Sequence, residues 1–106
     1  MYYVKALNLQ VIINFADKVT EDIFNGLDSK AARSVPHTIW RTAVRKLDMI
    51  NAAAEIRDLR VPPANRLEKL KGDLSDFYSI RINDQYRIIF KWNNHNAEDV
   101  LITDYH

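Results

Sequence analysis

This chain of 106 residues is 47% hydrophobic and 27% charged, which favours one globular domain over residues 1–106, with residues 1–9 as an N-terminal extension. It contains no cysteine, which excludes disulfide bonds, thiolate metal sites and a cysteine nucleophile. The net charge is +1, yet residues 57–91 hold eight Lys or Arg against five Asp or Glu. Such local imbalance permits a surface for a polyanion, and an ordinary solvated surface explains it equally well.

The N-terminal residues lack the charged-then-apolar pattern of a signal peptide. No apolar run approaches the ~20 residues that a membrane-spanning helix needs. We therefore expect a soluble, cytoplasmic protein with no membrane partner.

The first predicted elements are a strand and a short helix. Residues 11–15 (VIINF) are β-branched or aromatic apart from one asparagine, which is typical of a strand in a buried sheet. Asp17 can cap the helix that follows, Glu21 lies in its first turn, and Gly26 can end it.

A second, longer helix is predicted to begin near Pro36, with Ser34 as its cap, and to end around Ala53. Four apolar residues recur at helical spacing and form its inward stripe: Ile39, Ala43, Leu47 and Ile50.

The remainder of the chain is predicted to be β-structure. The expected strands are residues 66–70, 77–82, 86–92 and 99–103. Residues 83–85 suit a hairpin turn between the second and third of these strands. The fold class is therefore α+β in the order β-α-α-β-β-β-β, with two N-terminal helices packed on a mostly antiparallel sheet of four to five strands.

Side chains should alternate along residues 86–92. Tyr86, Ile88, Phe90 and Trp92 would point to one face of the sheet. Arg87, Ile89 and Lys91 would then point to the other face, which gives that face basic character.

Three sequence blocks now carry a resemblance. They are LKGD at 70–73, SIRIND with the following YRI, Phe90 and Trp92, and the terminal DYH at 104–106. Together, from about Val11 to the last residue, they resemble the HigB toxins of the RelE-like superfamily. The resemblance implies a type II toxin that cuts messenger RNA on the translating ribosome and arrests growth. It also implies a HigA-like helix-turn-helix antitoxin, and binding to operator DNA only as the toxin–antitoxin complex.

RNA cleavage without a metal needs a base for the 2′-hydroxyl, cations for the phosphorane, and an acid for the departing 5′-oxygen. Arg87 is the first choice for the phosphate clamp, because a guanidinium stays charged and grips phosphate oxygens bidentately. The matching family position is catalytic; the alternative is an arginine that packs its stem on the sheet. Lys71 matches a family lysine of the active site, or is an ordinary solvated lysine.

Tyr105 and His106 are the acid–base candidates, and the matching family pair is functional. Histidine titrates near neutrality, whereas tyrosine offers a hydroxyl and a face for base stacking. This sequence departs from some relatives at Glu68, where they have a histidine. A carboxylate can act as a base but also repels phosphate, which leaves the identity of the general base open.

Further basic residues are assigned to RNA binding rather than to chemistry. They are Arg66, Lys69, Arg81 and Lys91. No metal site or cofactor is predicted, because the three histidines have no partners at ligand spacing.

Two other functions remain open from the sequence. A ParE-like toxin would share the fold and poison DNA gyrase as a non-enzymatic inhibitor, with no need for an acid–base pair. A plain RNA-binding module would hold the RNA backbone on its basic strands without cutting it, and its binding would depend strongly on salt.

Overall fold

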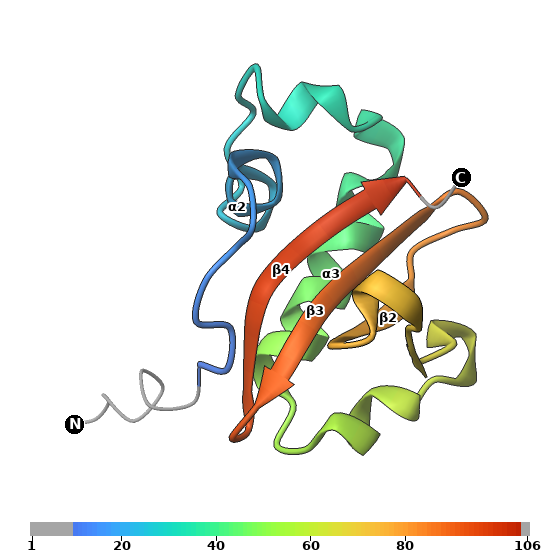
Figure 1. Ribbon diagram of the computed structural model, residues 1–106. Helices are drawn as coiled ribbons and strands as arrows, with labels where there is room; N and C mark the ends of the chain where they lie inside the picture. Colours follow the sequence, from blue (N-terminus) through green and yellow to red (C-terminus); the bar gives the residue numbers. More distant parts are fainter. Residues whose placement is uncertain (1–9, 105–106) are drawn as a thin grey trace.

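Within residues 10–104, the structure has two α-helices followed by a four-stranded antiparallel sheet (Figure 1). This computed structural model describes residues 10–104, so the predicted extension at 1–9 lies outside the described residues. The α-helices are α2 (Lys18–Phe24) and α3 (Trp40–Ala52), and the strands are β1 (Glu68–Lys69), β2 (Phe77–Arg81), β3 (Tyr86–Asn93) and β4 (Asn96–Asp104). Short 3-10 helices are η1 (Ala32–Ser34), η2 (His37–Ile39), η3 (Ile56–Arg60), η4 (Pro63–Asn65) and η5 (Gly72–Leu74). The strands lie side by side in chain order, and the predicted α+β class is confirmed.

Helix α2 forms as its local sequence predicts. The Asp17 side chain accepts a hydrogen bond of 2.8 Å from the backbone N–H of Thr20, which satisfies one of the free donors of the first turn. Gly26, with φ +76°, follows the last turn in the left-handed conformation that favours glycine.

The predicted start of the second helix is wrong by one turn. Ser34 lies in η1 and donates its hydroxyl to the carbonyl of Ala31 at 2.8 Å, so that side chain is turned backward and caps nothing. Residues 37–39 then form η2, and α3 begins at Trp40. Its inward stripe is confirmed, with Ala43, Leu47 and Ile50 fully buried.

The predicted strand at 11–15 does not form as a strand. The segment makes two isolated parallel bridges with β4, at Ile12 and Phe15. Between the two bridges the ladder is interrupted at Asp99, which has φ +52° and donates its backbone N–H to the Asn14 side chain at 3.0 Å. The sheet of the described residues therefore has four strands, within the predicted range of four to five.

The β2–β3 hairpin closes through residues 83–85, as predicted. The Asn83 side chain accepts hydrogen bonds from the backbone N–H groups of Gln85 and Tyr86, at 2.9 and 2.7 Å. Strand β1 is shorter than the predicted 66–70, because Arg66 has φ +47° and leaves η4 in the left-handed conformation.

The two faces of the sheet have different surroundings. One face packs against α3 through Ile80, Ile88, Phe90, Val100 and Ile102, which are at most 6% exposed. Burying each such side chain contributes roughly 1.5–3 kcal/mol, so this interface accounts for much of the core. The predicted alternation in β3 is thus confirmed, and the opposite face carries the basic residues of the hairpin.

Across residues 10–104, no helix combines the length and the apolar character that crossing a membrane requires.

Candidate functional site

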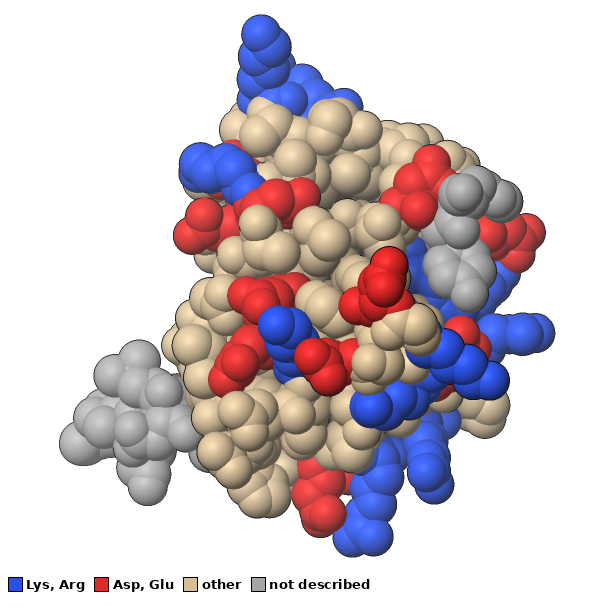
Figure 2. All heavy atoms as spheres, in the orientation of Figure 1, with Lys and Arg blue, Asp and Glu red and all other residues tan. Residues whose placement is uncertain are grey.

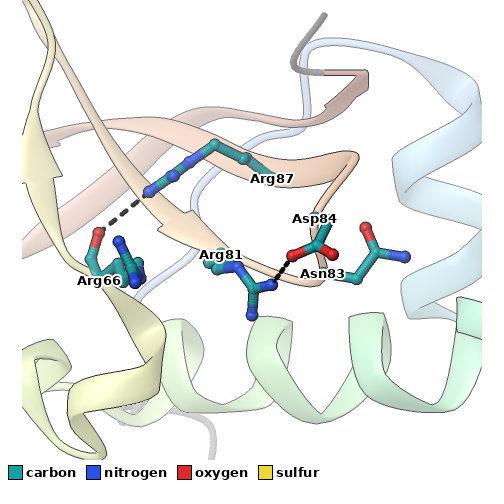
Figure 3. A pocket seen from close by; sticks show the side chains of 5 residues that line it. All are labelled: Arg66, Arg81, Asn83, Asp84 and Arg87. Atoms are coloured by element: carbon teal, nitrogen blue, oxygen red, sulfur yellow. Dashed lines mark hydrogen bonds and ion pairs between the residues drawn. The ribbon is translucent and has the colours of Figure 1, made fainter.

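A pocket of about 260 Å³ lies at the turn end of the β2–β3 hairpin (Figure 3). Its lining residues are Arg66, Arg81, Asn83, Asp84 and Arg87. They come from the end of η4, the last residue of β2, the hairpin turn and the second residue of β3. Three positive charges and one negative charge therefore surround one small volume, which favours an anion.

The pairing of the two strands places the central arginines together. Arg81 lies opposite Arg87 in the antiparallel register, so both side chains belong to the same face of the sheet. Like charges directly opposite each other destabilise a sheet. The pairing therefore costs stability, and it gives the pocket two neighbouring guanidinium groups.

Hydrogen bonds to two other described residues orient Arg87. Its Nε donates to the hydroxyl of Ser79, and its Nη2 donates to the backbone carbonyl of Arg66 at 3.0 Å (Figure 3). The residue is only 7% exposed. The carbonyl of Arg66, at the end of η4, lies against the guanidinium and helps to fix it in place beside the pocket.

Arg81 has a second interaction within the pocket, an ion pair between its Nη2 and the Asp84 carboxylate (Figure 3). The Asp84 side chain is 98% exposed and that of Arg81 is 32% exposed. An ion pair as exposed as this one contributes about 0–1 kcal/mol, so an incoming phosphate can displace it at little cost.

A buried lysine lies close behind this cluster. Lys46, in α3, is 6% exposed, and its Nζ donates to the Asn65 side chain. Burial lowers the pKa of Lys46 below its usual 10.5, and the nearby positive charges of Arg45 and Arg81 lower it further. Lys46 was not selected from the sequence, although its spacing from Ala43 already placed it on the inward stripe of the helix.

Two of the predicted residues lie on β1. Glu68 is opposite Ser79 in the register and is exposed. Strand β2 lies between it and β3, which carries Arg87. Lys69 is opposite Tyr78, with its Nζ 5.7 Å from the centre of that ring. Alternation along β1 therefore directs these two side chains to opposite faces.

Lys71 and Lys91 lie toward the other end of the hairpin. Lys71 is exposed at the start of η5, next to Leu70, whose N–H bonds the carbonyl of Phe77. Lys91 lies opposite Phe77 and pairs with Asp99 at 3.3 Å. Lys91 is four positions further along β3 than Arg87, a distance of roughly 13 Å along a strand. The structure thus brings together Arg66, Arg81 and Arg87, and leaves these two lysines outside the pocket.

Tyr105 and His106 lie outside the described residues. The last described residue, Asp104, is opposite Tyr86 in the β3–β4 register and accepts a hydrogen bond of 2.9 Å from the Gln85 side chain. Strand β4 therefore ends beside the turn of the hairpin, next to Arg87.

Basic side chains also gather outside the pocket. Figure 2 shows Lys and Arg concentrated at the lower right, over the segment between α3 and β2, whereas both signs mix over β3 and β4. Among residues 10–104, no group of three His, Cys, Asp or Glu is arranged to hold a metal ion. Ser79, Asn83 and Asp84 were missed from the sequence, because a small residue and a turn carry no signal for a site by themselves.

Comparisons with known proteins identify the family of this chain. Residues 13–106 match the family described as "RelE-like toxin of type II toxin-antitoxin system HigB". The chain is 44% identical over 80 residues to Toxin HigB-1 of Vibrio cholerae serotype O1, covering 76% of this chain and 82% of that protein. It is also 44% identical over 68 residues to an uncharacterized protein of Haemophilus influenzae, covering 64% of this chain and 67% of the other.

A solved structure shows the same fold. The YoeB–YefM complex from Staphylococcus aureus contains a chain that superposes with a TM-score of 0.51 at 21% identity, covering 90% of this chain and 94% of that one. The family match spans nearly the whole chain, pocket included, and agrees with the resemblance carried by the sequence blocks. This chain belongs to the HigB-like family of RelE-like toxins of type II toxin–antitoxin systems.

Proposed function

We propose that this protein is a ribosome-dependent endoribonuclease that cuts messenger RNA during translation. The observation that carries the proposal is the pocket in which Arg66, Arg81 and Arg87 surround one volume, with the Arg87 guanidinium fixed by Ser79 and the Arg66 carbonyl. A pocket of this charge and size suits one phosphate group of an RNA backbone.

In the proposed reaction, a base removes the proton of the 2′-hydroxyl and the 2′-oxygen attacks the adjacent phosphorus. The bond to the 5′-oxygen breaks, and an acid protonates that leaving oxygen. The products are a 2′,3′-cyclic phosphate and a 5′-hydroxyl. Arg87 and Arg81 stabilise the negative charge that builds up on the phosphorane oxygens.

Proton transfer is assigned to Tyr105 and His106, with Glu68 as the alternative base. The end of β4 supports this assignment, since Asp104 already lies beside the hairpin turn. Two further residues extend the chain by at most ~7 Å, which keeps them within reach of the Arg87 end of the sheet. The role of Lys71 as a further charge stabiliser stays a prediction. Its position supports this role less well, because Lys71 lies at the other end of the hairpin.

The proposed RNA-binding residues divide in the same way. Arg66 and Arg81 line the pocket, whereas the contributions of Lys69 and Lys91 stay predictions that their positions support less well. The proposed partners are the ribosome with its mRNA and a HigA-like helix-turn-helix antitoxin. The family supports an antitoxin partner, and the solved structure with the same fold is likewise a complex, of YoeB with YefM. Operator DNA would be bound only by the complex, and the proposed location is the cytoplasm.

The test is incubation with translating ribosomes, followed by mapping of mRNA ends, beside a gyrase supercoiling assay. We expect new ends with a 2′,3′-cyclic phosphate and unaffected supercoiling. Arg87→Ala and a variant lacking residues 105–106, each confirmed as folded, should cut at least ~100-fold more slowly. Inhibited gyrase with intact mRNA would instead establish the ParE-like function. Tight binding of RNA without new ends would establish the binding module, and full cutting by both variants would refute the site.

A further inference from the structure

Lys46 is a buried cation whose neighbouring charges are also positive. It is 6% exposed, and no carboxylate within residues 10–104 forms an ion pair with it. Two other cations, Arg45 and Arg81, are near enough to repel it. Burying a charge in this way is costly unless hydrogen bonds compensate it. A leucine or methionine at this position would complete the apolar stripe of α3 at no such cost.

The partner that compensates Lys46 is Asn65, which is itself fully buried. The oxygen of the Asn65 side chain accepts from Lys46. Its nitrogen donates to the backbone carbonyl of Leu59 at 3.1 Å and lies 3.4 Å from that of Val61. The amide therefore ties α3 to two points of the segment that leads into η4, and it leaves that segment little freedom.

Asn65 immediately precedes the residue that contacts Arg87. Arg66 has φ +47° and ψ 54°, and this left-handed conformation turns its carbonyl toward the Arg87 guanidinium, 3.0 Å from Nη2. The buried amide and the carbonyl that orients the arginine of the pocket therefore belong to adjacent residues. A shift of Asn65 would move that carbonyl directly.

We infer that Lys46 and Asn65 form a buried positioning pair, which holds the Arg66 carbonyl against Arg87 and so sets the orientation of the guanidinium toward a bound phosphate. Lys46 acts through Asn65 and Arg66 and does not contact the RNA itself. The catalytic consequence rests on the proposed nuclease function, whereas the effect on Arg87 geometry does not.

The kinetic test replaces Lys46 by an apolar residue of similar shape. Lys46→Met should lower kcat for mRNA cutting on programmed ribosomes about 10-fold or more, because small misplacements of a catalytic group are costly. KM should change less than about 2-fold, since most ribosome contacts are untouched. Lys46→Gln keeps a neutral donor for Asn65 and should recover part of kcat. Lys30→Met, at an exposed lysine between α2 and η1, is the matched control and should leave both constants unchanged.

A double-mutant cycle shows whether Lys46 acts through Arg87. In an Arg87→Lys background the guanidinium is absent, so Lys46→Met should have little further effect on the rate. An undiminished loss in that background would overturn the proposal, because Lys46 would then act by another route.

A measurement without RNA separates this proposal from the nuclease function. The Arg87 Nε–H signal in a nitrogen–proton NMR spectrum, assigned by its loss in Arg87→Lys, should be protected from exchange by the bond to Ser79. Lys46→Met should shift this signal and speed its exchange, while Lys30→Met should not.

Each outcome then has a definite reading. An unchanged Arg87 signal and an unchanged kcat in Lys46→Met would overturn the inference. If Lys46→Met shifts the Arg87 signal but the wild-type protein cuts no mRNA, the positioning pair is retained and the proposed function is refuted. If Lys46→Met does not fold, Lys46→Gln is compared with the wild type in the same assays. A variant in which kcat falls, KM rises and the unfolding midpoint falls together would show that Lys46 has only a structural role, and would overturn the inference.

Discussion

The two ends of the β2–β3 hairpin carry similar basic side chains in opposite electrostatic settings. At one end, Lys91 lies 3.3 Å from the Asp99 carboxylate and 5.4 Å from the centre of the Phe77 ring. At the other end, Arg81 and Arg87 face each other, and the acid that shares their pocket is the exposed Asp84. Alternating basic residues are therefore insufficient to make an anion site. The positions of the acidic side chains, together with the burial of Arg87, decide which end can bind a phosphate.

The acid at the Lys91 end has a structural task of its own. Asp99 accepts a hydrogen bond of 2.7 Å from the Asn14 side chain, and its N–H donates to the Asn14 oxygen at 3.0 Å. This pair joins the N-terminal segment to β4, and Lys91 neutralises the remaining charge. One end of the sheet thus uses its charges for assembly, whereas the other keeps an excess of positive charge.

Substituting one cation at each end should give the largest contrast. Arg87→Ala should slow mRNA cutting on translating ribosomes by at least ~100-fold, because it removes the fixed guanidinium of the pocket. Lys91→Ala should change the rate by about 3-fold or less, since that charge is half exposed and already paired. Equal losses in both variants would mean that the whole basic face binds RNA, with no privileged pocket.

Arg81 should matter less than Arg87 and in a different constant. Arg81→Ala should raise KM about 10-fold with a smaller change in kcat, because a single hydrogen bond to a charged group is lost from a partly exposed side chain. Steady-state cutting rates over a range of ribosome concentrations measure both constants. A loss confined to kcat would instead place Arg81 in the chemical step.

Removing the acid of the pocket should have a weaker and opposite effect. Asp84→Asn releases Arg81 from its ion pair and should lower KM about 2- to 3-fold. Asp73→Asn, at an exposed acid in η5, is the control for the change in net charge. If both variants lower KM equally, the gain comes from overall charge, and the ion pair plays no part in binding.

The smallest effect should appear in stability at low pH. Hydrogen bonds from Asn14 and then Lys91 lower the pKa of Asp99 below 3.8. The folded state therefore binds this proton less readily than the unfolded state, so the stabilisation is present above pH 3.8 and is lost as the pH falls through the lowered value. The urea unfolding midpoint should fall less between pH 5 and pH 2.5 in Asp99→Asn than in the wild type. Cutting at neutral pH should be unaffected, and an identical acid dependence would contradict the assignment.

Elements set by neighbouring residues were predictable from the sequence. Helix α2 follows from Asp17 and Gly26, and the β2–β3 turn follows from Asn83, because cap and turn bonds span only a few residues. The core face of β3 followed from simple alternation. The same alternation placed Arg87 and Lys91 on the other face, and the terminal sequence blocks pointed to the family.

Contacts between distant residues decided the rest. Asn14 accepts the backbone N–H of Asp99, 85 positions away, and the left-handed Asp99 interrupts the pairing, which leaves two bridges in place of a predicted strand. The left-handed Arg66 and the buried pair of Lys46 with Asn65 likewise depend on how η4 packs on α3 and β3. By itself, the sequence determined the α+β class, the helices and the basic strands, because these depend on local spacing. Only the tertiary structure decided which cations share a pocket, because that depends on the strand register and on contacts between segments that are distant in the sequence.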